Sequence, residues 1–167
     1  MKKKENLDNI IEIIIECFLN GGKLLIFGCG GSAAEATHMA AEFMGKGLPA
    51  IALTDSAIVT ALANDLGFSQ VFSRQIFVLG ETKDVAIALS TSGKSRSILN
   101  GIDKAKNMGM EVIDWPRELP MSPMFNLSKD EKTARIQEYQ LKLIHDVYLA
   151  VNKKFNKWEF LLKRQLE

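Results

Sequence analysis

The chain has 167 residues, of which 47% are hydrophobic, and its 21 Lys and Arg nearly balance its 20 Asp and Glu. This length supports one self-sufficient domain, and the composition lies far from that of disordered chains. A formal charge of +1 gives no basic field for a phosphate backbone, which argues against nucleic acid as a partner. Two cysteines outside any CxxC spacing favour a reducing compartment, and no apolar run reaches the roughly 18–20 residues of a membrane span. We therefore expect a cytoplasmic protein without membrane contact.

The first element is a helix over residues 6–20, whose thin polar stripe predicts that it is buried on most sides. The basic start followed by apolar residues also fits a secretion signal, but Glu12 and Glu16 interrupt the apolar core. Next come a strand over residues 23–27 and a helix from Ser32 to about Met44. Ser32 with Glu35 three residues later predicts a capping box at the start of this helix.

The same alternation continues along the rest of the chain. We expect strands at 50–53, 85–89, 110–113 and 124–127, helices at 56–63, 69–79 and 96–108, and a long helix from about Thr133 into the 150s. Short apolar strands alternating with helices are typical of a parallel sheet that is covered on both faces. The sequence thus predicts one three-layer α/β/α domain over residues 1–167, with four or five parallel strands and ligands at their carboxyl ends.

The first strand ends in a loop with almost no side chains, Gly28-Cys29-Gly30-Gly31-Ser32-Ala33. Its backbone N–H groups are free to meet an anion or a sugar hydroxyl at the start of the next helix. The loop nearly matches the dinucleotide fingerprint, and Asp55 lies where a ribose-binding acid would fall. Tight packing of strand against helix is the purely structural alternative.

A second loop, Ser90-Thr91-Ser92-Gly93-Lys94-Ser95, joins a strand to a helix. Its hydroxyls and free N–H groups at the positive end of a helix predict a site for a phosphomonoester. The end of the loop is also typical of a Walker A motif, but Ala88 stands where that motif needs its first glycine. A ligand-free cluster of capping and turn residues is the other alternative.

Both histidines of the chain lie on predicted helices. His38 and Glu42 are four residues apart, so both can address one metal ion or one substrate proton. An exposed His beside a solvated Glu is the alternative, although the five alanines at positions 33, 34, 36, 40 and 41 indicate a helix made for close packing. His145 lies on the long last helix with Gln137 eight residues earlier, a spacing of about 12 Å that is long for one small ion.

Taken together, these residues resemble the sugar isomerase (SIS) domain family and, within it, are similar to the phosphoheptose isomerases. The matching segments run in order from about Gly21 to Val151: Gly30-Gly31-Ser32-Ala33-Ala34 with His38 and Glu42, Leu48-Pro49-Ala50-Ile51-Ala52-Leu53-Thr54, Asn64-Asp65 before Gly67-Phe68, Val71-Phe72-Ser73-Arg74-Gln75, the serine loop of residues 90–95, and Thr133-Ala134-Arg135-Ile136-Gln137-Glu138 with His145.

The resemblance implies a flavodoxin-like fold and conversion of sedoheptulose 7-phosphate to a D-glycero-D-manno-heptose 7-phosphate, a step towards heptose for surface glycans. It implies a metal, usually zinc, on His38, Glu42, Gln137 and His145, with Glu42 and His145 as the proton-transfer pair and no nucleotide cofactor. It implies a homo-oligomer, tetramer or dimer. Sugar phosphate contacts fall on Cys29, Gly30, Gly31, Ser32, Asn64, Asp65, Ser90, Thr91, Ser92, Ser95 and Gln137.

The expected reaction is an aldose–ketose isomerisation through an enediol, with Glu42 as the carbon base and His145 as its acid/base partner. A metal-bound carboxylate is a poorer base, so either Glu42 leaves the ion during turnover or the ion is partly structural.

The chain departs from the family at Cys29, where Asn is usual, in the segments 45–48 and 114–123, and in its shorter N-terminal region. Three alternatives stay open: a non-catalytic SIS module, a Rossmann dehydrogenase, and an isomerase of another sugar phosphate.

Overall fold

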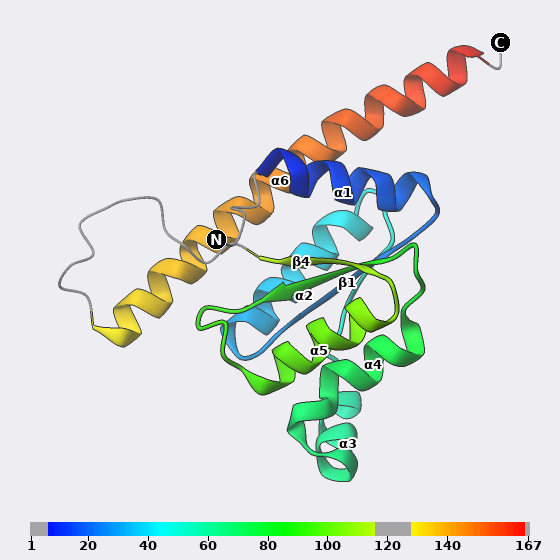
Figure 1. Cartoon of the computed structure of the whole chain (residues 1–167). Helices are drawn as coiled ribbons and strands as arrows, with labels where there is room; N and C mark the ends of the chain where they lie inside the picture. Colours follow the sequence, from blue (N-terminus) through cyan, green and yellow to red (C-terminus); the bar gives the residue numbers. More distant parts are fainter. Residues whose placement is uncertain (1–6, 116–127, 166–167) are drawn as a thin grey trace.

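The computed structural model describes residues 7–115 and 128–165, and side chains up to residue 155. Strands and helices alternate along these residues as the sequence predicts (Figure 1). In chain order they are α1 (Leu7–Leu19), β1 (Leu24–Gly28), α2 (Gly31–Met44), β2 (Ala50–Ala52), α3 (Ser56–Leu66), the short 3-10 helix η1 (Phe68–Gln70), α4 (Val71–Leu79), β3 (Val85–Leu89), α5 (Arg96–Asn107), β4 (Glu111–Asp114) and α6 (Lys129–Gln165).

The four strands form one parallel sheet in the order β2-β1-β3-β4. β1 and β3 are its centre and are buried at every position, which explains why their sequences are wholly apolar. Their register pairs Leu24 with Val85 and Gly28 with Leu89. The two strands therefore end side by side, and the loops that follow them lie at the same edge of the sheet. The strand expected at residues 124–127 lies outside the described residues.

Helices cover both faces of the sheet (Figure 1), and each face carries its own hydrophobic core. Alternate strand residues such as Leu24 and Ile26 pack with α1, α2 and α6 on one face. Leu25 and Phe27 point the other way and pack with α4 and α5. This alternation follows from the two-residue period of a strand, and it gives the predicted three layers. Six of the thirteen residues of α1 are buried, and Glu12 and Glu16 of its predicted polar stripe are exposed.

The two helices that carry the site residues do not begin where the sequence suggests. α2 begins at Gly31, after Gly30 turns the chain with a φ of +59°, and no side chain caps it. Ser32 lies inside the helix, so the predicted capping box of Ser32 and Glu35 is wrong. α6 begins at Lys129, four residues before the predicted Thr133, because Ser128 and Glu131 cap it reciprocally with N–H to oxygen distances of 2.8 and 3.3 Å.

The helix after β2 is less buried than the other α-helices of the described chain. α3 is largely apolar, yet none of its residues is buried, and Ile58 and Leu66 are about half exposed. Ile51 of β2 and Phe68 of η1 are exposed as well.

Among the described residues, no helix is both long and apolar enough to cross a membrane.

Candidate active site

Loop 1, residues 28–32, connects β1 to α2 and turns without room for larger side chains. A Cβ on Gly28 would lie 2.5 Å from the main-chain oxygen of Ser32. The turn is closed by the N–H of Ser32, which donates to the oxygen of Cys29 at 3.2 Å, and by the N–H of Ala33, which donates to Gly30 at 3.0 Å. This geometry requires glycine at position 28, and the positive φ of Gly30 favours glycine there too.

The fold brings together His38 and Glu42 of α2 and His145 of α6. The Nε2 atoms of the two histidines are 2.9 Å apart, their rings meet edge to face, and Nε2 of His38 is 3.7 Å from Oε1 of Glu42. One donor atom from each residue lies within 4.8 Å of the others, and all three side chains reach solvent. A substrate can therefore approach this cluster, here called the His–Glu–His cluster.

The donor set of the cluster suits a divalent metal. Two imidazole nitrogens and a carboxylate oxygen are typical zinc ligands, and tetrahedral zinc with bonds of about 2.0–2.1 Å would place two such nitrogens about 3.3 Å apart. The observed 2.9 Å between the two Nε2 atoms requires only a small adjustment of the rings to reach that distance. The residues present thus fit a metal ion, with room for a fourth ligand.

The side chain of Gln137 lies against loop 1. A Cβ on Gly31 would come within 2.1 Å of Nε2 of Gln137, so the amide occupies the space that this glycine leaves free. Gly31 is seven residues before His38, which is about two turns of α2. The structure therefore joins Gln137 to the candidate sugar-phosphate loop, and its role as a metal ligand stays a prediction.

Gly31→Ala tests this contact. Gly31 has no positive φ, and Ala is the better helix former by about 1 kcal/mol, so we expect stability to urea to be kept. The new methyl group displaces only the end of a flexible side chain, and we expect kcat/KM to fall about tenfold or more. Gly45→Ala at the other end of α2 is the matched control, with its nearest neighbour at 3.3 Å. Equal activity of the two variants would remove Gln137 from the site.

Glu35 is a buried carboxyl on α2, and no sequence pattern predicts its burial. It is 8% exposed, and its Oε2 has no hydrogen-bond partner among the described residues. Loss of solvent raises the pKa of Glu35 to about 7, because burial disfavours the charged form. The pKa of Glu35 is thus higher in the folded protein than in the unfolded chain. As pH rises from about 4.5 to 7, the unfolded chain loses this proton first, so the free energy of unfolding decreases.

Glu35→Gln is accordingly expected to stabilise the protein at pH 8 by about 1–3 kcal/mol, because each pH unit between the ordinary and the raised pKa contributes about 1.4 kcal/mol. At about pH 3, below both the ordinary and the raised pKa, the carboxyl is neutral in both states and the gain should disappear. Urea denaturation at several pH values measures both. A gain that does not vary with pH would show that the carboxylate charge is not its cause.

The serine loop, residues 90–95, follows β3 and adjoins loop 1. Its shape is fixed by two of its own hydroxyls, since Ser90 Oγ accepts from the N–H of Gly93 at 3.0 Å and Ser92 Oγ accepts from that of Lys94 at 3.2 Å. Ser95 is the N-cap residue of α5, but its side chain makes no capping bond. Its hydroxyl is therefore not committed to the N–H groups at the start of α5.

Cys29 links loop 1 to the start of α5. Its Sγ lies 3.8 Å from Oγ of Ser95 and 3.5 Å from Oγ of Ser97, and these two hydroxyls are 3.1 Å apart. Ser97 is buried and Ser95 is half-buried. The residue that departs from the family pattern therefore contacts the hydroxyls of the second loop, which the sequence could not reveal.

Four other residues that the sequence analysis singled out lie outside the His–Glu–His cluster. Asn64 and Asp65 lie exposed on α3 and bond to each other at 2.9 Å, and no hydrogen bond within the described part of the chain ties them to either loop. Thr91 of the serine loop is half-buried. Asp55, the acid of the dinucleotide alternative, instead caps α3 by accepting from the N–H of Ile58 at 2.9 Å.

Sequence reasoning missed one polar residue close to the site. Gln140 of α6 is fully buried, and its side chain contacts the oxygen of Ser90. The sequence does contain a signal for this residue. Gln140 is three or four residues from Ile136, Leu143 and Ile144, so it shares their apolar helix face.

Comparison with known proteins agrees with this geometry. The family model described as SIS domain matches residues 1–114. A phosphoheptose isomerase of Helicobacter pylori strain P12 is 40% identical over 164 residues, which cover 91% of this chain and 85% of that protein. Phosphoheptose isomerase 1 of Campylobacter jejuni strain NCTC 11168 is also 40% identical, with 91% and 88% covered.

Solved structures give the same result. The phosphoheptose isomerase structure from Neisseria gonorrhoeae superimposes with a TM-score of 0.77 at 37% identity, covering 89% of this chain and 86% of that one. The structure from Francisella tularensis gives a TM-score of 0.76 at 30% identity, with 88% and 84% covered. The fold, the order of the motifs and the relatives agree, and the chain belongs to the SIS domain family and, within it, to the phosphoheptose isomerases.

Proposed function

We propose that the protein isomerises sedoheptulose 7-phosphate to a D-glycero-D-manno-heptose 7-phosphate in the cytoplasm. The observation that carries the proposal is the His–Glu–His cluster, which places a carboxylate and two imidazoles within 4.8 Å of one another. The relatives named above act as phosphoheptose isomerases, and loop 1 and the serine loop offer hydroxyls and N–H groups at the same sheet edge. Such an arrangement can hold a sugar phosphate at one end and move protons at the other.

The chemistry moves one proton between neighbouring carbons. Glu42 takes a proton from C1 of the ketose, the electron pair forms the C1–C2 double bond of the enediol, and the proton returns to C2 to give the aldose. His145 donates a proton to the oxygen on C2 and accepts the one on the oxygen of C1, so that no charge accumulates. Ser90, Thr91, Ser92 and Ser95 hold the phosphate, and this remote binding energy positions C1 and C2.

The cluster would hold zinc through His38, Glu42 and His145, with Gln137 as a further ligand. When bound, such an ion polarises a carbonyl as a Lewis acid. His38 then acts as an anchor that is not needed for proton transfer, whereas Glu42 and His145 serve both purposes. Metal analysis of the purified protein, with His38→Ala as the comparison, tests this part of the proposal: we expect one zinc per chain and a loss of affinity in the variant.

We propose further that the protein is a homo-oligomer, a tetramer or a dimer. Exposed apolar side chains on β2, α3 and η1 support this, because Ile51, Ile58, Leu66 and Phe68 are each 39–53% exposed and exposed apolar surface is typical of an interface. Light scattering coupled to size-exclusion chromatography measures the mass. A monomer at micromolar concentration would contradict the proposal.

The decisive experiment incubates the protein with a panel of ketose phosphates, with and without a chelator, and follows products by NMR. We expect the aldose heptose phosphate to form from sedoheptulose 7-phosphate, and the chelator to slow its formation. Conversion of a different member of the panel would assign another sugar phosphate, which the contacts of Cys29 with the serine hydroxyls make a specific alternative. Binding without any conversion would leave a non-catalytic sugar-phosphate module.

A further inference from the structure

Gln140 is the polar residue on an otherwise apolar face of α6. Ile136, Leu143, Ile144 and Val147 on this face are 0–6% exposed, and Gln140 is 0% exposed. A buried amide is costly unless it is hydrogen-bonded, and leucine would serve packing alone at this position. Packing alone therefore does not explain why an amide stands at position 140.

The contacts of Gln140 join three elements at the carboxyl edge of the sheet. Its Nε2 donates to the main-chain oxygen of Ser90 at 3.4 Å, and its own main-chain oxygen accepts from Nε1 of Trp115 at 3.4 Å. Trp115 is completely buried, and its main-chain N–H donates to the main-chain oxygen of Ala88 in β3 at 2.9 Å. Gln140 thus connects α6 to the ends of β3 and β4.

The two ends of this connection carry the two halves of the proposed site. Ser90 begins the serine loop, and its hydroxyl shapes the loop by accepting from the N–H of Gly93. His145 lies five residues after Gln140 on the same rigid helix, with its Nε2 beside that of His38. A shift of α6 relative to Ser90 would change the distance between the phosphate contacts and the proton-transfer pair.

We propose that Gln140 is a positioning residue that fixes α6, and with it His145, relative to the serine loop. The inference rests on the proposed function, in which the loop binds the phosphate and His145 moves protons. One substrate must reach both places at once, and a small misplacement of reacting groups lowers the rate strongly. Gln140 touches neither the phosphate nor the reacting carbons in this assignment, and it acts through Ser90 and α6.

The test compares Gln140→Leu, which keeps the size and removes the donor, with Leu143→Met on the same buried face. Calorimetry measures the affinity for inorganic phosphate, and kinetics with sedoheptulose 7-phosphate gives kcat and KM. We expect Gln140→Leu to bind phosphate about tenfold more weakly and to lose 10- to 100-fold in kcat/KM, whereas Leu143→Met changes each less than about threefold. Phosphate affinity and kcat/KM within twofold of the unmodified protein in Gln140→Leu would overturn the proposal.

Gln140→Glu supplies a second readout that loss of packing would not produce. An ionised carboxylate repels the oxygen of Ser90, but a protonated one donates to it, so phosphate affinity relative to the unmodified protein should improve as pH falls from 8 to 5. A ratio that stays constant over this range would overturn the proposal, even if Gln140→Leu does not fold.

A third measurement needs no change at Gln140. The chain has two tryptophans, so Trp158→Phe leaves Trp115 as the only emitter, bonded to the main chain of Gln140. We expect inorganic phosphate to shift its emission, and an unchanged emission while calorimetry shows binding would overturn the proposal. Absence of phosphate binding in the unmodified protein would instead remove the proposed role of the serine loop, and this inference with it, so the two failures are distinguishable.

Discussion

Glu42→Gln is expected to lower kcat by about 10²–10⁴-fold, which is the usual contribution of a positioned acid or base. The amide has nearly the same shape as the carboxylate but cannot accept a proton from carbon. Glu42 is 31% exposed in its side chain and lies 3.7 Å from His38, so the change leaves the core intact. Stopped assays of sedoheptulose 7-phosphate turnover, with thermal denaturation to check the fold, measure the effect.

Glu138→Gln provides the matched control for this experiment. Glu138 is an exposed carboxylate on α6, and its ion pair with Arg135 at 2.6 Å lies at the surface. We expect its turnover to stay within about twofold of the unmodified protein. If Glu42→Gln retains full turnover as well, Glu42 is not the carbon base, and the proton must be taken by another residue of the His–Glu–His cluster.

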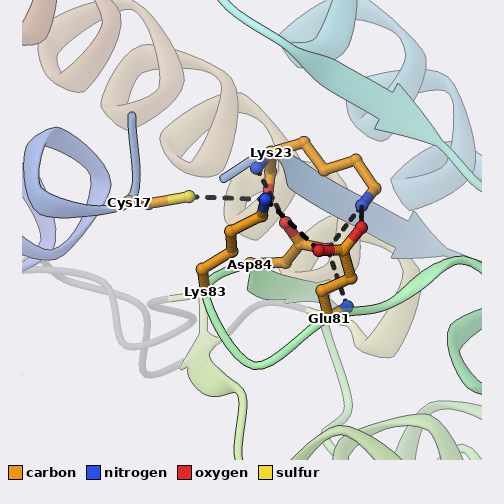
Figure 2. Close-up of polar contacts among 5 residues, drawn as sticks. All are labelled: Cys17, Lys23, Glu81, Lys83 and Asp84. Carbon is orange, nitrogen blue, oxygen red and sulfur yellow. Dashed lines mark hydrogen bonds and ion pairs between the residues drawn. The ribbon is translucent and has the colours of Figure 1, made fainter. Parts of the chain in front are cut away.

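Asp84→Asn is expected to destabilise the fold by about 3 kcal/mol. Asp84 is 1% exposed and joins the starts of β1 and β3 at the edge opposite to the site (Figure 2). Its carboxylate accepts from the N–H and the Nζ of Lys23 at 2.9 and 2.6 Å and from the N–H of Glu81 at 2.8 Å. An amide there turns a donor towards donors, and removing one partner of a buried pair is costly. Urea denaturation measures the loss.

Glu81→Gln is the control for Asp84, because it removes a charge next to the same lysine without burial. Glu81 is 61% exposed and lies 3.9 Å from Nζ of Lys23 (Figure 2). Exposed ion pairs contribute less than about 1 kcal/mol, so we expect a correspondingly small change. Equal losses in the two variants would mean that charge near Lys23 matters, and not the buried hydrogen bonds of Asp84.

Two Ser-x-x-Glu sequences of the chain show where a local pattern is not enough to predict a helix cap. Both read Ser-x-x-Glu, at Ser32 to Glu35 and at Ser128 to Glu131. The second, which the sequence analysis did not single out, forms a capping box because both residues are exposed and free to face the helix start. The first does not, since Ser32 and Glu35 are 3% and 8% exposed and Gly30 starts the helix earlier. Tertiary burial decided between identical local signals.

In the candidate site, too, some contacts follow from the sequence and others only from the packing of distant elements. His38 and Glu42 could be paired from the sequence because residues four apart always share a helix face. His145 is 107 positions away from His38, and only the family resemblance suggested that they meet. The contacts of Gln137 with Gly31 and of Gln140 with Ser90 depend on how α6 packs over the sheet edge, which no local pattern encodes.

The sequence by itself determined the parallel sheet and its alternation with helices, because wholly apolar strands of five residues can only be stable between two covered faces. It also determined that the two candidate ligand loops follow β1 and β3. The tertiary structure alone decided that α3 stays uncovered, that Glu35 is buried with a raised pKa, and that α6 brings His145 to α2. These features arise from contacts between distant segments, whose free energies depend on geometry rather than on neighbouring residues.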